Sequence, residues 1–320
     1  MLYIIINIHF FPFKMITKEI SPITFVTAFY KLYEEEPYEH KTIEWRIENF
    51  RVLAKSGIKI IIYSCEKTKE YISNLCDEFP VNLFHGNLLI PYEETEIYKM
   101  SMKKDDEGSP LELPSNRNSQ KDTYEYLTLM NCKIEFVRDA ILQNPWGSLY
   151  FAWMDFSMAY LFSNKEETSK KMLTFLEEAS PKPEMNFSKR SVEKLDGFSV
   201  ACEGEDNSIK KMKKILAFPG CWSKISSNYY LMVKDNICWR FCGTFFLGDK
   251  ESILEMYQFY IEHYPRFIKE TNKLTWEVNI WAWLEANTLW TPQWYSSDHN
   301  DRLITDLVAF LGEHCIEENV

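Results

Sequence analysis

Short apolar runs alternate with amphipathic segments in the first part of the chain. Residues 23–29 (ITFVTAF) and 58–63 (IKIIIY) are short and rich in β-branched residues, as expected of buried strands. Between them, apolar residues recur at three- and four-residue spacing from 43 to 54, and Gly57 stands where a left-handed helix cap is expected. A strand, a helix and a strand in this order predict two parallel strands.

The same alternation continues to residue 142. It predicts a helix near 67–76 and a short strand at 81–84. Residues 86–122 are polar and contain three prolines, which predicts a long surface loop and a candidate active-site lid. Residues 124–142 form one amphipathic helix in this interpretation, with Lys133 at the edge of its apolar stripe.

Residues 149–155 (LYFAWMD) are apolar at both alternating sets of positions until the aspartate. Such a run is typical of a central strand that helices cover on both sides. Asp155 therefore emerges at the carboxyl end of a strand, where open parallel sheets bind their ligands.

The remaining chain contains one weakly periodic segment, 180–220, which we interpret as a connector or insertion. After it we expect strands near 229–233 and 239–247 and helices at 250–268 and 275–286. The predicted fold is α/β, with a mixed, mostly parallel sheet flanked by helices. One domain spans 23–320, and an apolar extension of residues 1–22 precedes it.

Composition bears on the classes of binding partner and on the cellular location. The 320 residues carry a formal net charge of -11, which disfavours nucleic acid or an anionic membrane as the partner. The eight cysteines form no CxxC pair, as is typical of free thiols in a reducing compartment such as the cytoplasm. Residues 1–13 are too short to span a bilayer, so no transmembrane span is predicted; peripheral membrane attachment and a secretory lumen remain alternatives.

Three acidic positions are candidates for chemistry. Asp155-Phe156-Ser157 is similar to the Asp-x-Asp signature that holds a divalent cation, without its second aspartate; a turn or helix cap is the alternative. The segment 298–301 (DHND) offers metal ligands or a polar turn that caps the last helix. Glu277 lies on an apolar helix face, either as a functional carboxylate or as a favourable N-terminal charge.

Gly243 and Gly248 bracket a Phe-rich strand, where they permit either the close approach of a sugar or simple turns. The chain has no nucleophile elbow, no P-loop and no GxGxxG fingerprint. The sequence therefore gives no support for a hydrolase, a P-loop NTPase or a Rossmann dehydrogenase.

Several blocks together resemble one family, the HtrL/YibB-type proteins of bacteria and some large DNA viruses, which look like glycosyltransferases of the GT-A fold. The blocks are ITFVTAF, YLTLMNCKIEFVRDAI, FAWMDFSMAYLF, LTWEVNIWAWLE and SDHND, and they run from residue 23 to about 304. The resemblance implies a GT-A-like, nucleotide-diphospho-sugar transferase fold. For a viral member it implies the host cytoplasm as the location.

The resemblance also implies a UDP-sugar site. Asp155 takes the place of the first Asp-x-Asp carboxylate and binds Mn²⁺ or Mg²⁺, and His299 with Asp298 completes the metal shell. Ser157 stands where the family usually has glycine, and its hydroxyl can ligate the metal. The residues implied in binding uridine or diphosphate are Lys133, Arg138, Trp153, Ser157 and Thr27.

Catalysis and the acceptor follow from the same resemblance. Glu277 would act beneath the anomeric carbon of a retaining transferase, together with Asp155. The acceptor region comprises Gly243, Thr244, Gly248 and Trp276, with Thr244 in place of a second glycine. The implied reaction moves a hexose from a UDP-sugar to a glycan or glycoprotein, for example glycosylated hydroxylysine in collagen-like protein. An inactive carbohydrate-binding module and a purely structural protein are the alternatives.

Overall fold

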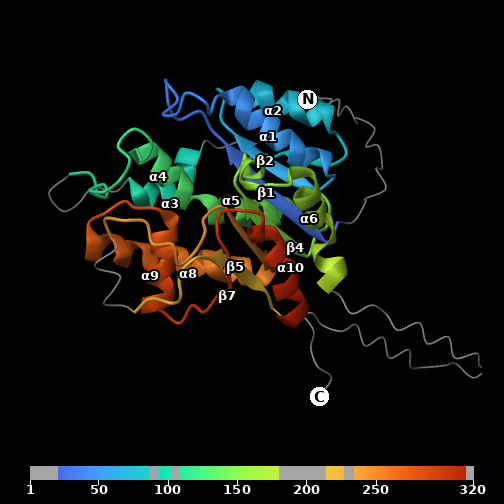
Figure 1. Cartoon of the computed structure of the whole chain (residues 1–320). Coiled ribbons are helices and arrows are strands. Elements are labelled where there is room, and N and C mark those ends of the chain that lie inside the picture. The colour runs from blue at the N-terminus through green and yellow to red at the C-terminus, as the bar shows by residue number, and fades with distance from the viewer. Residues whose placement is uncertain (1–20, 87–91, 103–108, 180–213, 227–233, 315–320) are drawn as a thin grey trace, which may run out of the picture.

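A seven-stranded sheet forms the centre of the computed structural model, which describes residues 21–86, 92–102, 109–179, 214–226 and 234–314 (Figure 1). The strands are β1 (Ile23–Phe29), β2 (Ile60–Ser64), β3 (Leu83–His85), β4 (Tyr150–Met154), β5 (Leu216–Gly220), β6 (Phe245–Asp249) and β7 (Gln293–Ser296). Their order across the sheet is β3-β2-β1-β4-β6-β5-β7.

All strands of this sheet except β6 run in one direction. Strands β3, β2, β1 and β4 pair in parallel, β6 is antiparallel to both β4 and β5, and β7 is parallel to β5. The chain builds outward from β1 to β3 on one side and continues from β4 on the other. The strand order therefore reverses between β1 and β4, and a crevice is expected beyond their carboxyl ends.

Helices cover both faces of the sheet (Figure 1). The helices with eight or more residues are α1 (Ile43–Lys55), α2 (Lys69–Glu78), α4 (Tyr124–Asn131), α5 (Lys133–Gln143), α6 (Lys165–Ala179), α8 (Lys250–Thr271), α9 (Glu277–Asn287) and α10 (Arg302–His314). Helices α1, α2, α6 and α10 pack on one face, and α4, α5, α8 and α9 on the other. In β4, Phe151 and Trp153 join one core and Ala152 and Met154 the other, which explains the unbroken apolar run.

The strongest sequence patterns are confirmed. Strand β1 has the predicted bounds, α1 begins at Ile43, and Gly57 has a φ of +89°. Strands β1 and β2 are parallel, as the strand-helix-strand order predicts. A mixed α/β fold with a mostly parallel, helix-flanked sheet is therefore established.

The predicted helix 124–142 is wrong as one element, because it is two helices. Helix α4 ends at Asn131 and α5 begins at Lys133, with the Cys132 N–H donating to the carbonyls of both Thr128 and Leu129. Lys133 does not lie at the edge of an apolar stripe, since it is only 1% exposed.

The predicted loop 86–122 is wrong in part. It contains a 3-10 turn, η1 (Tyr92–Glu94), and a short helix, α3 (Glu96–Ser101). The carboxylate of Glu135 accepts hydrogen bonds from the N–H groups of the first two residues of α3, and Ile97 is fully buried. This segment is docked on α5, which argues against a lid there. Its helix is too short to show periodicity in the sequence.

Other boundaries differ in the second half. Of the predicted connector 180–220, the last five residues form β5, and 180–213 lie outside the described residues. The strand expected at 229–233 also lies outside them, and the one expected at 239–247 begins only at Phe245. Strand β7 was not predicted.

At the N-terminus, residues 1–20 of the predicted extension lie outside the described residues. The Pro22 carbonyl accepts hydrogen bonds from the N–H groups of Leu149 and Tyr150, so the end of the predicted extension is attached to the start of β4. No helix in the described ranges combines the length and the hydropathy needed to cross a bilayer.

Candidate functional site

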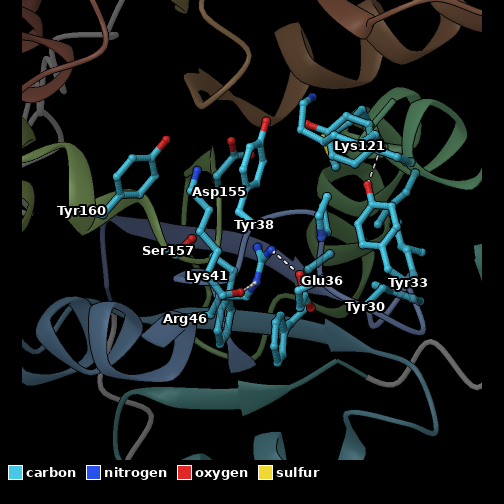
Figure 2. A pocket seen from close by; sticks show the side chains of 18 of the residues that line it. Tyr30, Tyr33, Glu36, Tyr38, Lys41, Arg46, Lys121, Asp155, Ser157 and Tyr160 are labelled. Atoms are coloured by element: carbon cyan, nitrogen blue, oxygen red, sulfur yellow. Dashed lines mark hydrogen bonds and ion pairs between the residues drawn. The ribbon is translucent and has the colours of Figure 1, made fainter. Parts of the chain in front are cut away.

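A pocket opens at the carboxyl ends of β1 and β4, where the strand order reverses (Figure 2). Residues 28–30 at the end of β1 and 155–157 after β4 form its floor, and the segment 32–46 forms a wall. The hollow measures about 1030 Å³, counting the space open to solvent. This position suits a small-molecule ligand in an open α/β sheet.

Tyrosines dominate the lining of this pocket. They are Tyr30, Tyr33, Tyr38, Tyr126 and Tyr160. Burial is the main cause that raises the pKa of the phenols of Tyr33, Tyr126 and Tyr160 above the usual value, and nearby carboxylates add to it. These phenols therefore stay neutral at physiological pH and offer ring faces and hydroxyl groups to a ligand.

Three cations face the same pocket. The Lys41 ammonium lies 5.0 Å from the ring centre of Tyr38 and 4.9 Å from that of Tyr160. Burial, followed by the charges of Arg46 and Lys121, lowers the pKa of Lys41. A lowered lysine pKa means that its charge is not fully compensated, so an anion bound beside Lys41 would be stabilised.

Arg46 and Lys121 are partly neutralised already. Arg46 donates to Glu36 at 3.0 Å, and Lys121 is paired with Asp122 while its ammonium lies 4.1 Å from the ring centre of Tyr126. Figure 2 shows the Arg46–Glu36 pair beside Lys41. Among the charged residues that line the pocket, the three cations thus stand beside two carboxylates, those of Glu36 and Asp155.

Behind the pocket, Lys133 joins two of the predicted acidic residues. Its ammonium lies 2.7 Å from Oε1 of Glu277 and 3.0 Å from Oδ1 of Asp155, and it donates to the Gly243 carbonyl at 2.9 Å. Burial alone would lower the pKa of Lys133, but the two carboxylates outweigh it and raise the pKa above the usual value. The lysine therefore stays charged although it is buried.

Asp155 lies at the boundary between this ion cluster and the pocket. Its Oδ1 also accepts a hydrogen bond of 3.0 Å from the indole N–H of Trp153, and its backbone N–H donates to the Thr244 carbonyl. The side chain is 38% exposed and lines the pocket. Trp153 and Thr244 thus fix the direction of this carboxylate.

Glu277 begins α9 and is buried, 5% exposed. A methyl group at Gly243 would come within 2.2 Å of its Oε1, so the absence of a side chain at Gly243 makes room for the carboxylate. Of the described side chains, Lys133 stands between Glu277 and Asp155. This placement makes Glu277 a partner of Lys133, whereas the resemblance implied direct action on the sugar.

The predicted metal ligands Asp298 and His299 lie after β7, beside two cysteines. Ligand atoms of His299, Cys221 and Cys242 are all within 4.8 Å of one another, and the thiol of Cys221 lies 3.7 Å from Oδ1 of Asp298. Mn²⁺ and Mg²⁺ prefer oxygen ligands. The neighbours of His299 therefore suit a softer ion than the one predicted.

The rest of the segment 298–301 caps and anchors helices. Asn300 Oδ1 accepts from the Arg302 N–H at the start of α10, and Asp301 accepts from the backbone of Ser163 and the hydroxyl of Thr168. Asn300 and Asp301 therefore match the alternative prediction for this segment, a polar turn that caps the last helix.

Other predicted ligand-binding residues are placed elsewhere. The guanidinium of Arg138 lies 5.3 Å from the ring centre of Tyr257 on α8, and Thr27 is fully buried within β1. Neither lines the pocket, because Arg138 lies on the side of α5 that faces α8 and Thr27 is enclosed by the sheet.

The residues predicted to bind the acceptor do not lie together in the structure. Gly248 pairs with Phe151 inside the sheet, and a methyl group there would lie 3.0 Å from the Ile215 carbonyl. The close packing of the sheet accounts for this glycine. Trp276 is 5% exposed at the start of α9, whereas Gly243 and Thr244 lie beside the ion cluster.

Sequence reasoning missed the wall of the pocket. The segment 30–41 (YKLYEEEPYEHK), which contains much of this wall, supplies three tyrosines and Lys41 to the pocket. The signal was present, because this aromatic and charged segment directly follows the carboxyl end of the first strand. Without the strand order, nothing showed that it faces Asp155.

Two side chains that carry oxygen atoms, Asp155 and Ser157, lie on the floor of the pocket. The hydrogen bond and the ion pair described for the Asp155 carboxylate involve Oδ1, which leaves Oδ2 available, and the Ser157 hydroxyl lines the same pocket. Magnesium is commonly held by one or two carboxylates plus substrate phosphates. Asp155 and Ser157 are therefore the residues of this pocket that would hold such an ion, with a bound diphosphate supplying further oxygens.

Comparison with models of known protein families and with curated proteins gives no match for this chain.

Proposed function

We propose that the protein is a glycosyltransferase that moves a hexose from a UDP-sugar to a glycan or glycosylated protein. The observation that carries this proposal is the pocket at the reversal of strand order, which places ring faces and a partly uncompensated lysine beside Asp155. A nucleoside diphosphate combines the flat base and the two phosphates that such a lining recognises.

In this proposal the tyrosines of the wall bind the nucleoside, and Lys41 and Arg46 bind the diphosphate. Neutral phenols stack on a base without electrostatic cost, while the two cations attract the phosphate oxygens. Asp155 and Ser157 would hold a Mn²⁺ or Mg²⁺ ion, which supplies charge neutralisation for the departing diphosphate.

The buried lysine gives the site a second cationic element. Lys133 holds Asp155 in place, and the carboxylates of Asp155 and Glu277 together keep Lys133 charged in its low-dielectric surroundings. Glu277 is thus a positioning residue in this proposal. Groups fixed in advance at a reacting centre contribute more than mobile ones, because they need no reorganisation during the reaction.

The fold and the blocks of sequence point the same way. A seven-stranded, mostly parallel sheet flanked by helices is compatible with the GT-A fold that the HtrL/YibB resemblance implies.

The six cysteines in the described part of the chain are free, which suits a reducing compartment such as the cytoplasm. Glycosylated hydroxylysine of collagen-like protein is the acceptor suggested by the resemblance.

The first test is release of free UDP from a panel of UDP-sugars with and without Mn²⁺, since donor hydrolysis requires no acceptor. The proposal expects manganese-dependent release from one sugar, and Asp155→Ala should lower it by about 100-fold or more. No release from any sugar, together with no binding of UDP by calorimetry, would refute it and favour the carbohydrate-binding module.

A matched pair of lysine variants tests the pocket itself. Lys41→Met should weaken UDP binding by about tenfold, or about 1.4 kcal/mol, and leave uridine binding unchanged. Lys67→Met is the control, because Lys67 is 59% exposed and paired with Glu34. Equal UDP affinity in the two variants would place the diphosphate elsewhere.

A further inference from the structure

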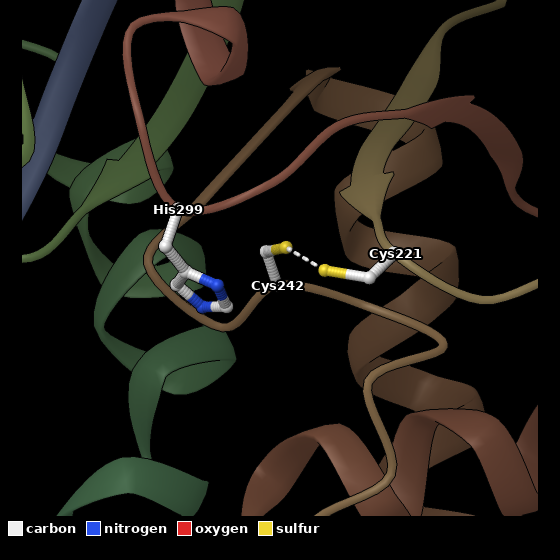
Figure 3. Close-up of side chains that lie close together, drawn as sticks. All are labelled: Cys221, Cys242 and His299. Carbon is white, nitrogen blue, oxygen red and sulfur yellow. Dashed lines mark hydrogen bonds between the residues drawn. The ribbon is translucent and has the colours of Figure 1, made fainter.

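Three chain segments bring soft metal ligands together at the end of the sheet where β5 ends and β6 begins (Figure 3). Cys221 directly follows β5, Cys242 precedes β6, and His299 lies in the loop after β7. In sequence they are 21 and 57 residues apart, from the numbering 221, 242 and 299, so no short motif announces them.

The distance between the two sulfurs matches that expected when both bind one tetrahedrally coordinated metal ion. The sulfurs of Cys221 and Cys242 are 3.8 Å apart. Two thiolates bound to one zinc at about 2.3 Å each are themselves about 3.8 Å apart at the tetrahedral angle, whereas a disulfide brings them to about 2.05 Å. The pair is therefore spaced for a shared ion.

Asp298 adds an oxygen on the open side. Its Oδ1 is 3.7 Å from the sulfur of Cys221 and 3.5 Å from Nδ1 of His299. Zinc bond lengths of about 2.0 to 2.3 Å place such neighbouring ligand atoms about 3.3 to 3.6 Å apart. The ligand nitrogen of His299 lies within 4.8 Å of both sulfurs, so it has to approach them by up to about 1.3 Å to reach the roughly 3.5 Å of a tetrahedral zinc site.

The backbone around these ligands is held by hydrogen bonds between the three segments. The Cys242 N–H donates to the Pro219 carbonyl at 2.8 Å, the Cys221 N–H to Trp239 at 2.9 Å, and the Ser297 N–H to Gly220 at 2.9 Å. The ring of Trp239 packs edge-on against His299, with centroids 4.7 Å apart. The ligands thus start from fixed positions, which lowers the entropy cost of binding an ion.

We propose that Cys221, Cys242 and His299 bind one zinc ion, with Asp298 as the fourth ligand. Two thiolates and an imidazole favour Zn²⁺ over the hard cations Mn²⁺ and Mg²⁺. Cys242 is buried and Cys221 is reachable from solvent, which gives the ion an entry path. This site is separate from the proposed donor pocket, and the inference does not depend on the proposed function.

The ion would clamp the segment that supports the buried charges. Cys242 is bonded to Gly243, whose carbonyl accepts from Lys133 and whose missing side chain makes room for Glu277. A zinc-bound Cys242 would fix this backbone against the segments that carry Cys221 and His299. The role is structural, since the four protein ligands complete a tetrahedral shell.

The test uses the full chain and Zn²⁺ alone, after treatment with a chelator and a thiol reductant. We expect one zinc per chain by native mass spectrometry and a higher midpoint of thermal unfolding when zinc is added. Cobalt(II) in place of zinc should give the absorption of tetrahedral cobalt together with a thiolate-to-cobalt charge-transfer band. A cobalt spectrum without the thiolate band would overturn the proposal.

Variants assign the ligands. Cys221→Ser and His299→Ala should each lower zinc affinity by about 100-fold or more, and Asp298→Asn by about tenfold. Cys76→Ser and His263→Ala are the controls, since neither residue belongs to the cluster. Cys221 and His299 are not fully buried, so both variants should fold. Zinc affinity in Cys221→Ser equal to that of the Cys76→Ser control would refute the site.

Discussion

Lys133 and Glu277 form a buried ion pair, with 2.7 Å between Nζ and Oε1, although they are 144 residues apart in the chain. The lysine begins α5 and the glutamate begins α9. Asp155, after β4, completes the cluster at 3.0 Å. The buried Lys133 thus holds the Asp155 carboxylate at the floor of the pocket. Removing this cation should change the free energy of unfolding measurably.

Lys133→Met should destabilise the protein by about 3 to 5 kcal/mol, because it leaves the Glu277 carboxylate buried without its counter-charge. Urea unfolding at pH 7 measures the free energy of unfolding. Lys99→Met is the matched control: Lys99 is 54% exposed and pairs with Glu96 on the surface of α3. Its loss should cost under about 1 kcal/mol. Similar costs for both variants would contradict the role of the buried pair.

Gly243→Ala should displace Glu277, because the added methyl group would lie 2.2 Å from Oε1. We expect a loss of stability of about 1 to 3 kcal/mol from overpacking. Gly312→Ala in α10 is the control, since a methyl group there meets nothing within 4 Å. Replacing a helical glycine by alanine should stabilise by about 0.5 to 1 kcal/mol. A Gly243→Ala variant as stable as the parent would argue against the close fit.

Glu277→Gln tests positioning under the proposed function. The amide keeps the shape of the side chain but removes the charge that supports Lys133, so UDP affinity should stay the same while turnover falls by about tenfold or more. The measurement is kcat and KM for UDP release, with binding of UDP by calorimetry in parallel. Unchanged turnover would reduce Glu277 to a purely structural charge.

Asp235 ties the segment around Ser115 to Lys273 and gives a prediction about pH. The hydrogen bond from Lys273, followed by that from the Ser115 backbone, lowers the pKa of Asp235 from 3.8 to about 2. A lowered carboxyl pKa contributes stability above about pH 4, and this contribution is lost as the pH falls toward 2. Asp235→Asn should therefore cost about 1 to 2 kcal/mol at pH 7 and progressively less below pH 4.

Thermal unfolding of the Asp235→Asn variant and of the parent protein between pH 7 and pH 2.5 measures the difference in their stability. Asp77→Asn on the exposed surface of α2 is the control, and its effect should not depend on pH in the same way. A constant difference between Asp235→Asn and the parent over the whole range would contradict the assigned contacts.

The sequence by itself determined the elements whose patterns are local. Strand β1, helix α1 with Gly57, and the strand that delivers Asp155 could all be predicted, because periodicity and caps depend on residues within a few positions of one another. The break between α4 and α5 could not. It follows from contacts with distant segments, such as the donation from the Asn131 side chain to the Thr275 carbonyl.

Only the tertiary structure decided which candidates meet. Lys133, Asp155 and Glu277 were each singled out in the sequence, but their convergence depends on strand order and helix packing. The same packing placed Arg138 against Tyr257 and gathered Cys221, Cys242 and His299. A side chain's type and spacing are properties of the sequence, whereas its neighbours across more than a hundred residues are set by how the sheet and helices assemble.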